Sequence, residues 1–302
     1  MSGRKEDDVV RRAAVTGWSR HSFASPAVFR LPYVADHVVL ARRTRKALLD
    51  GPGFAVVTGV PVTSMTIQDL QRFSESMLSH LGVPLTQGRG ADMARAWLVR
   101  DEGVSAHTDD RRFHENAYTS KSRGYLHLHN DRAVRPFGHE PDYLALLTHR
   151  RARQGGDSLL ADGWAVHQIL CEEFPRELDV LHTPFPFDRR HVTPPGGSPV
   201  VWAPVFEERD GRVHVRCNVK RNETAAELTG APLPSGKRAA LDALKHVLDR
   251  PDLRVSILLE AGDCLITDDR RVLHGRTAYD DHATLRRCLV RVMLTDGSDA
   301  DR

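Results

Sequence analysis

The sequence predicts a jelly roll or barrel built mainly from short β-strands, with a few flanking helices. Two observations lead to this fold class. Beyond about residue 94 the chain consists of short runs of strand length, separated by turn residues and interrupted by few helical patterns. The sequence also lacks a glycine-rich phosphate-binding loop of either common type, which argues against doubly wound nucleotide-binding folds. We therefore expect a mainly β architecture rather than strands that alternate with helices.

The first part of the chain predicts an arm followed by a helix, a strand and a second helix. Residues 1–25 are charged and aperiodic, as in a loose N-terminal arm. The run HVVLARRTRKALL from His37 to Leu49 predicts a helix, which the glycines and proline at 51–53 stop. GFAVVTGVPV then predicts a valine-rich strand. TIQDLQRFSESMLSHL has helical spacing, and we expect Gly82 to cap this helix.

The rest of the chain supplies the strands of the predicted sheet. The candidate strands are ARAWLVR, GYLHLH, DYLALLTH, DSLLAD, PVVWAPVFEE, RVHVRCNV, RVSILLE, DCLITD and RRCLVRVML. Asp210-Gly211 predicts a hairpin turn between PVVWAPVFEE and RVHVRCNV. Helices are expected for WAVHQILCEEF and for the segment from Ser235 to Leu248. No break in composition divides the chain, so we expect a single domain over residues 1–302 with a core at about 45–295.

Composition excludes several classes of protein. The 302 residues are 40% hydrophobic and 27% charged, as in globular proteins, and no run approaches the ~18 apolar residues of a membrane span. The N-terminus lacks the apolar run of a secretory signal. A formal net charge of +3 is too small to require a nucleic-acid partner. Four widely spaced cysteines indicate reduced thiols and a cytoplasmic location, while the oligomeric state, including a homo-oligomer, stays open.

One set of residues is typical of a metal site. In GYLHLHNDRA, His129 and Asp131 are two residues apart at a predicted strand end, so both side chains can face one ion. Far downstream, ITDDRRVLHGRTAY places His274 after a short apolar strand. Two histidines and one carboxylate form the ligand set of non-haem Fe(II) oxygenases, which leaves positions open for dioxygen and a cosubstrate. The alternative is a cupin-type pair of His127 and His129 in a zinc or manganese hydrolase or isomerase, although the following glutamate of such a site is absent.

Two arginines follow the second histidine. Arg287 and Arg291 fall on one face of the predicted strand RRCLVRVML, which is otherwise apolar. Burying two guanidinium groups is costly unless anions pair with them. We therefore expect each to meet a carboxylate, in the forked geometry that arginine favours. The alternative is that this strand face is simply solvated.

Four sequence blocks together resemble a known family. They are GPGFAVVTGVP with the helix ending in LGVPLTQ, HND, GGDSLLADG, and GDCLITDDRRVLHGRTAY followed by RRCLVR. In this order, over about residues 45–295, they resemble the taurine dioxygenase and clavaminate synthase-like group of Fe(II)/2-oxoglutarate-dependent oxygenases. The resemblance implies a distorted double-stranded β-helix, a cupin-like jelly roll, that uses Fe(II), O2 and the cosubstrate 2-oxoglutarate.

The resemblance also implies roles for individual residues. His129, Asp131 and His274 match the three iron ligands of the family. Ser158 and Arg287 match the hydroxyl and the arginine that bind the distal carboxylate of 2-oxoglutarate. Beyond the metal ligands, no separate catalytic residue is expected.

Further positions match parts of the family that contact the prime substrate. Arg291 matches a position that in some members holds an anionic group of the substrate, and its alternative role is to pair with a protein acid such as Glu260 or Asp263. Arg216 and Asn218 resemble a strand motif that lines the pocket, with a packing role as the alternative, and His127 lies near the metal ligands.

The chain departs from the family at Asp269, where relatives often have asparagine. The polar segment 101–123, which includes a second His-x-Asp pair at His107 and Asp109, corresponds to the lid and leaves the substrate open. The resulting hypothesis is a dioxygenase that hydroxylates a small polar, anionic metabolite, such as an amino acid derivative, sulfonate or phosphate ester, and releases succinate and CO2. A non-catalytic nucleic-acid-binding protein is the other alternative, which leaves the metal-ligand set unexplained.

Overall fold

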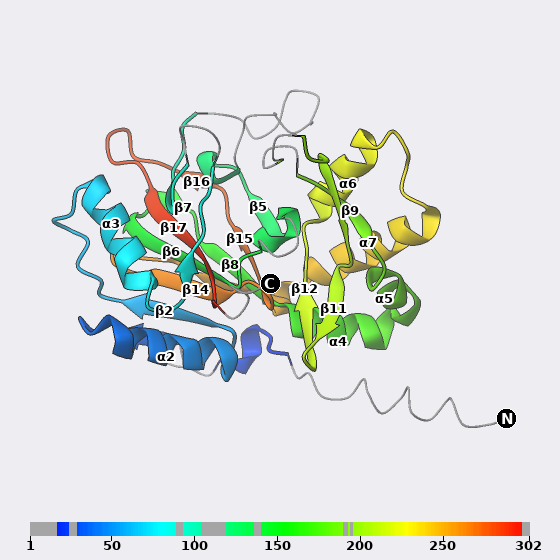
Figure 1. Ribbon diagram of the computed structural model, residues 1–302, viewed down its shortest axis with the longest axis horizontal. Helices are drawn as coiled ribbons and strands as arrows, with labels where there is room; N and C mark the ends of the chain where they lie inside the picture. Colours follow the sequence, from blue (N-terminus) through cyan, green and yellow to red (C-terminus); the bar gives the residue numbers. More distant parts are fainter. Residues whose placement is uncertain are drawn as a thin grey trace.

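Two facing β-sheets form the centre of the protein (Figure 1). The computed structural model describes residues 17–23, 29–88, 93–103, 119–135, 140–189, 193 and 196–297. The larger sheet has the order β1-β2-β14-β6-β17-β3, with β4 also paired to β17, and the smaller sheet has the order β13-β8-β15-β5. Within the described ranges no helix is long and apolar enough to cross a membrane.

The strands and helices have the following bounds. The larger sheet consists of β1 Arg30–Pro32, β2 Phe54–Thr58, β3 Val83–Pro84, β4 Ala96–Val99, β6 Tyr143–Arg150, β14 Cys264–Asp268 and β17 Cys288–Thr295. The smaller sheet consists of β5 Leu126–His129, β8 Ser158–Asp162, β13 Val255–Ile257 and β15 Val272–Arg276. Three two-stranded ribbons pair β7 Gln154–Gly155 with β16 Tyr279–Asp280, β9 Phe185–Asp188 with β10 Val200–Ala203, and β11 Phe206–Arg209 with β12 Arg212–Val215. The α-helices are α2 His37–Leu49, α3 Ile67–Leu78, α4 Gly163–Glu173, α5 Pro175–Leu181, α6 Val219–Leu228 and α7 Ser235–Leu248.

Three apolar clusters hold these layers together. The cluster between the two sheets joins residues of the larger sheet, such as Phe54 and Leu265, to residues of the smaller one, such as Leu160. A second cluster packs α2 and α3 on the outside of the larger sheet, and a third gathers α4, α5 and α7 at the other end of the molecule (Figure 1). The interior between the sheets is thus filled with side chains, so a ligand site must lie toward an open end of the sandwich.

The predicted helix, strand and second helix of the N-terminal part are present, with one wrong boundary. Of the expected loose arm the structure describes residues 17–23, and Trp18 there is buried against Phe54, so this part of the arm is not loose. Helix α2 has the predicted range and begins after Asp36, whose carboxylate accepts hydrogen bonds from two main-chain N–H groups. Helix α3 is capped by Thr66 but ends at Leu78, so the prediction that Gly82 caps it is wrong. Gly82 instead allows a close approach of two chains, because a Cβ there would lie 2.2 Å from the carbonyl oxygen of Thr295.

The second half of the chain contains two helices, α5 and α6, that the sequence did not predict. The predicted hairpin is confirmed: β11 and β12 are antiparallel, and Asp210 and Gly211 both have positive φ, 54° and 71°. The strand predicted for RVHVRCNV ends at Val215, however, and the chain then enters α6, which was not predicted. Helix α5 was also missed. The change at α6 matters for the site, because this helix begins at the edge of the main cavity.

Candidate metal centre and its cavity

Neighbouring strands place the two candidate histidine ligands opposite each other. Strands β5 and β15 are antiparallel, and His129 pairs directly with His274 in their register. The two imidazole rings lie with their centroids 4.4 Å apart. The expectation that His274 follows a strand is wrong in detail, because it is the central residue of β15, between β8 and β5. The central position in a paired strand fixes the direction of its side chain.

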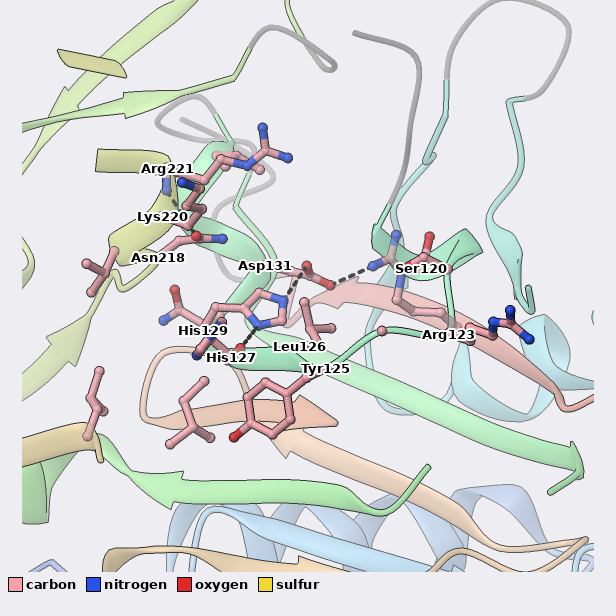
Figure 2. Close-up of a pocket in the computed structure, with 18 of the residues that line it drawn as sticks. Ser120, Arg123, Tyr125, Leu126, His127, His129, Asp131, Asn218, Lys220 and Arg221 are labelled. Atoms are coloured by element: carbon pink, nitrogen blue, oxygen red, sulfur yellow. Dashed lines mark hydrogen bonds and ion pairs between the residues drawn. The ribbon is translucent and has the colours of Figure 1, made fainter. Parts of the chain in front are cut away.

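The third candidate ligand comes from the turn after β5. Asp131 is the first residue of a 3₁₀ helix, η5 (Asp131–Val134), and its Oδ1 lies 3.8 Å from Nε2 of His129. Figure 2 shows the Asp131 carboxylate facing the His129 ring. One ligand atom from each of His129, Asp131 and His274 lies within 4.8 Å of the others. The structure therefore brings together the three residues singled out in the sequence, although a turn rather than strand alternation carries the carboxylate.

The protonation states of these side chains suit a divalent metal. Nδ1 of His129 lies 2.9 Å from the carbonyl oxygen of His127. Because a carbonyl oxygen can only accept a hydrogen bond, Nδ1 carries the proton, and the unprotonated Nε2 has a lone pair available for a metal. Burial lowers the pKa of His129, and burial together with the neighbouring His129 lowers the pKa of His274 to about 3. Burial alone would raise the pKa of Asp131, but Arg291 and the two histidines lower it to about 2. At neutral pH the centre thus offers two neutral imidazoles and a carboxylate, the set that fits Fe(II).

Arg291 lies at this centre but does not have the surroundings expected of a free anion-binding group. Its Nη1 is 3.0 Å from Oδ2 of Asp131, and its Nε donates to Oε1 of Gln87 at 2.8 Å. Arg291 therefore pairs with an acidic residue of the protein, which was the alternative prediction. That residue is Asp131 rather than either of the two expected ones, because Glu260 pairs with Arg151 and Asp263 with Arg30.

Of the two arginines expected on one strand face, only Arg291 lies within a strand. Arg287 precedes β17, and the pairing of this strand with β6 shifts between Cys288 and Leu289. The extra residue at this shift, His149, belongs to β6, so the alternation of side chains along β17 itself is not interrupted and the common face of the two arginines stays a prediction.

A second polar cluster surrounds Arg287. Its guanidinium stacks 5.0 Å from the centroid of the Tyr279 ring, and the guanidinium of Arg276 stacks 4.8 Å from the same ring. Arg287 is 5% exposed, burial lowers its pKa, and its buried Nη1 has no hydrogen-bond partner among the described residues. Ser158 pairs with Arg276 in the register of β8 and β15, and Gly156 lies against Arg287. A buried guanidinium nitrogen without a hydrogen-bond partner is costly unless a ligand pairs with it, so this cluster is suited to bind a carboxylate.

Sequence reasoning missed Arg276 and Tyr279 in this cluster. Both belong to the HGRTAY segment that directly follows the second histidine. The signal that could have found Arg276 is its separation from His274 by one residue on a strand, which places both side chains on the same face.

Arg216 has a packing role instead of a cavity position. It is 5% exposed, and its guanidinium donates to the carbonyl oxygens of Arg132 and Arg135 and pairs with Glu140. Arg216 is not among the residues that line the main cavity. These contacts clamp η5, the turn that presents Asp131, so the packing alternative describes Arg216 correctly.

We expect the clamp to contribute strongly to stability. Replacing Arg216 by alanine removes its ion pair with Glu140, whose side chain is 10% exposed, and should lower the free energy of unfolding by about 3–5 kcal/mol. The matched control is Arg209→Ala, which removes the exposed pair with Glu207 and should cost at most about 1 kcal/mol. Denaturant unfolding of both variants measures the difference, and equal losses would contradict the role of Arg216.

The main cavity opens beside the metal centre. It has a volume of about 630 Å³, and its lining includes His129 and Asp131 as well as the predicted substrate residues His127, Asn218 and Arg291. Figure 2 shows Asn218, Lys220 and Arg221 on one side of this cavity and Ser120 and Arg123 on the other. His127 is exposed and packs edge-on against Tyr125, with ring centroids 5.0 Å apart. The pair His107 and Asp109 of the expected lid lies outside the described residues.

Basic side chains dominate the charge of this cavity. Besides Arg291, the basic residues of its lining are Arg123, Arg135, Lys220, Arg221, Lys245 and Arg254, and the acidic ones are Asp101, Asp131, Glu223 and Asp249. Lys220 and Lys245 share a single carboxylate, Glu223, at 3.8 and 3.3 Å. A surplus of positive charge therefore faces a small molecule in the cavity.

Comparison with known proteins identifies the family. The family described as "Taurine catabolism dioxygenase TauD, TfdA family" matches residues 19–293. The chain belongs to this family. The resemblance inferred from the four sequence blocks is confirmed, and the expected enzyme class, a non-haem iron dioxygenase, agrees with it.

Individual relatives of this TauD/TfdA family member are moderately similar in sequence. FR-33289 synthase of Streptomyces rubellomurinus is 29% identical over 238 residues, which cover 76% of this chain and 64% of the relative. Uridine-5'-phosphate dioxygenase of a Streptomyces species is 30% identical over 259 residues, 82% of this chain and 88% of the relative. A uridine-5'-phosphate dioxygenase of an Amycolatopsis species is 33% identical over 151 residues, 50% of this chain and 54% of the relative. The match thus spans less than two thirds of the first and third of these relatives.

Solved structures confirm the fold of this family member. An asparagine oxygenase in complex with Fe(II), 2S,3S-3-hydroxyasparagine and succinate superposes with a TM-score of 0.61 at 19% identity, covering 85% of this chain and 79% of that one. The non-heme iron oxygenase OrfP in complex with Fe and alpha-ketoglutaric acid also gives a TM-score of 0.61, at 18% identity, covering 85% and 80%. The double-stranded β-helix predicted for this family member is therefore confirmed.

Proposed function

We propose that this protein is an Fe(II)- and 2-oxoglutarate-dependent dioxygenase that oxidises a small anionic metabolite. The observation that carries the proposal is the cluster of His129, Asp131 and His274, of which His129 and Asp131 line a cavity large enough for a small molecule. When bound there, the metal would activate dioxygen, which is the oxidant: one oxygen atom would enter the prime substrate and the other would enter succinate, formed from 2-oxoglutarate with loss of CO2.

The side chains of the protein bind and orient the reactants. His129, Asp131 and His274 would occupy one face of the metal and leave the opposite positions free for cosubstrate and dioxygen. Arg287, whose Nη1 has no partner among the described residues, would bind the distal carboxylate of 2-oxoglutarate in a desolvated site, and Ser158 would donate its hydroxyl to the same carboxylate.

Arg291 would act on the metal ligand rather than on the substrate. Its ion pair with Asp131 holds the carboxylate in its ionised form and in one orientation. Arg287 is thus assigned to the cosubstrate, and Arg291 to the metal ligand Asp131.

Within this proposal, the substrate is a phosphorylated small molecule with a planar group. The basic lining of the cavity supports an anionic substrate, and two relatives are uridine-5'-phosphate dioxygenases. Tyr125 and His127 provide exposed aromatic faces next to His129 on β5, where a planar ring could stack. Of the classes expected from the sequence, a phosphate ester thus fits better than an amino acid derivative.

Succinate formation from paired substrates tests this class. With Fe(II), 2-oxoglutarate and ascorbate present, uridine-5'-phosphate should stimulate succinate formation while uridine, which lacks the phosphate, should not. Replacing Lys220 and Lys245 together by glutamine should raise the KM for the phosphate substrate about tenfold, because charged hydrogen bonds are lost. The control Lys46→Gln alters an exposed pair with Asp50 on α2 and should have no effect. Equal responses to nucleoside and nucleotide, or no response to either, would contradict the proposed class.

The alternative of a metal-dependent hydrolase or isomerase gains no support from the site. Such an enzyme gives no role to the buried Arg287 and its partner-free nitrogen. The proposal includes a small-molecule substrate rather than nucleic acid, and a cytoplasmic protein, in line with the unpaired state of Cys171, Cys217, Cys264 and Cys288.

A further inference from the structure

A buried carboxyl group lies directly behind the metal centre. Asp269, on the turn between β14 and β15, has 0% exposed surface. Asp269 is the residue at which this sequence departs from its family, whose members often have asparagine there. The proposed function assigns no role to its side chain. A buried acid is costly to maintain unless its oxygens are used, so its contacts indicate what it does.

One set of contacts holds the turn that carries Asp131. Oδ1 of Asp269 accepts from the main-chain N–H of Asp131 at 3.3 Å, and Oδ2 accepts from that of Arg132 at 2.9 Å. The main-chain carbonyl of Asp269 also accepts from the side chain of Asn130 at 3.0 Å. The carboxyl group therefore uses both oxygens to fix the first turn of η5, the turn that presents the carboxylate ligand.

A second contact points to the ligand on the other strand. Oδ1 of Asp269 lies 3.7 Å from Nδ1 of His274, and this Nδ1 is buried with no hydrogen-bond partner among the described residues. His129, in contrast, has a main-chain carbonyl, that of His127, against its own Nδ1. Histidines that bind a metal through one nitrogen usually donate the other N–H to a carbonyl or carboxylate, which sets the tautomer. Asp269 is placed to serve His274 as the His127 carbonyl serves His129.

We infer that Asp269 is a positioning residue of the metal centre. Its carboxyl group links two ligands that are far apart in the sequence: it fixes the main chain of Asp131 and directs the Nδ1–H of His274, so that Nε2 faces the metal. This inference rests on the proposed function, because it concerns the same metal. It assigns to Asp269 an effect on metal affinity and ligand tautomer rather than contact with substrate.

The test compares Fe(II) affinity in two neighbouring variants. Asp269→Asn preserves the size of the side chain but replaces one accepting oxygen by an amide nitrogen that cannot accept, so either the N–H of Arg132 or those of Asp131 and His274 together lose their partner. Metal-free protein, titrated anaerobically with Fe(II) against a competing chelator, should show affinity about tenfold weaker in this variant, since asparagine, which relatives often have here, keeps one of the two accepting oxygens. The visible spectrum of the Co(II)-loaded variant should also differ from that of the wild type, because it reports the ligand field.

The matched control is Asp268→Asn, one residue earlier. Asp268 is also buried, but its carboxylate pairs with Arg270 at 2.9 Å. This variant should lose stability while its Fe(II) affinity stays within about twofold of the wild type. Equal Fe(II) affinity and an unchanged Co(II) spectrum in Asp269→Asn would overturn the inference, as would an equal loss of affinity in both variants.

A measurement on the wild type covers the case in which Asp269→Asn fails to fold. In protein loaded with diamagnetic Zn(II) and labelled with ¹⁵N histidine, the spectrum should show protonated Nδ1 for both His129 and His274. An unprotonated Nδ1 of His274 would overturn the inference. Failure of the wild type to bind Fe(II) at all would instead refute the proposed function, so the two failures are distinguishable.

Discussion

Alanine in place of His129, Asp131 or His274 is expected to abolish 2-oxoglutarate-dependent turnover while the protein still folds. Each substitution removes one of the three ligand atoms that lie within 4.8 Å of one another. The centre lies at the end of the sheet sandwich, whose apolar core is formed by other residues, so the metal is not needed to hold the fold. Fe(II) binding to metal-free protein and succinate formation after reloading should both fall below detection, while thermal unfolding remains cooperative.

The matched control for this prediction is His246→Ala. His246 is an exposed histidine on α7, away from the ligand cluster, and its loss should change neither Fe(II) binding nor turnover. Full activity in any of the three ligand variants, after chelation and reloading with Fe(II), would refute the assignment of that ligand.

Loss of Arg287 is expected to affect the cosubstrate rather than the metal. Arg287 is 5% exposed and its buried Nη1 is unpaired among the described residues, so a bound carboxylate would be desolvated and held by a strong charge-assisted bond. Truncating one partner of such a buried pair costs about 2–5 kcal/mol. Arg287→Ala should therefore raise the KM for 2-oxoglutarate by well over tenfold. Fe(II) affinity should remain that of the wild type.

Arg286 provides the control for Arg287. It precedes Arg287 in the chain, is exposed, and contributes its main-chain carbonyl to a hydrogen bond with Arg150, which Arg286→Ala keeps. This variant should have a normal KM for 2-oxoglutarate. An unchanged KM in Arg287→Ala would show that another group, such as Arg276, binds the cosubstrate.

The elements that the sequence predicted well are those whose local signals agree. Helix α2 has a capping aspartate at its start, helical apolar spacing, and a glycine–proline stop, so its range could be predicted to the residue. Helix α6 was hidden because the alternating residues of β12 run directly into it. Its start is set by Asn218, whose side chain accepts from the N–H of Arg221. One capping residue within a polar stretch is a weaker signal than strand alternation.

The candidate site shows the same division between local and long-range information. The three metal-ligand candidates could be identified because residue type and order along the chain are specific. The partners of Arg291 and Arg216 could not, since Asp131 and Glu140 reach them through register and turn geometry that no sequence spacing encodes. Asp269 belongs to this second group: its position next to both Asp131 and His274 arises only when β5 and β15 pair.

The most direct test of the proposed function is anaerobic binding of 2-oxoglutarate to the wild-type protein, measured by calorimetry with and without Fe(II). The three ligands and the buried, partner-free Nη1 of Arg287 among the described residues predict that one Fe(II) binds per chain and that one 2-oxoglutarate then binds tightly to the loaded protein. Without Fe(II), the cosubstrate should bind far more weakly, since its keto acid end has no metal to chelate. Binding of 2-oxoglutarate that is equally tight with and without Fe(II), or no binding to the Fe(II)-loaded protein, would contradict the account.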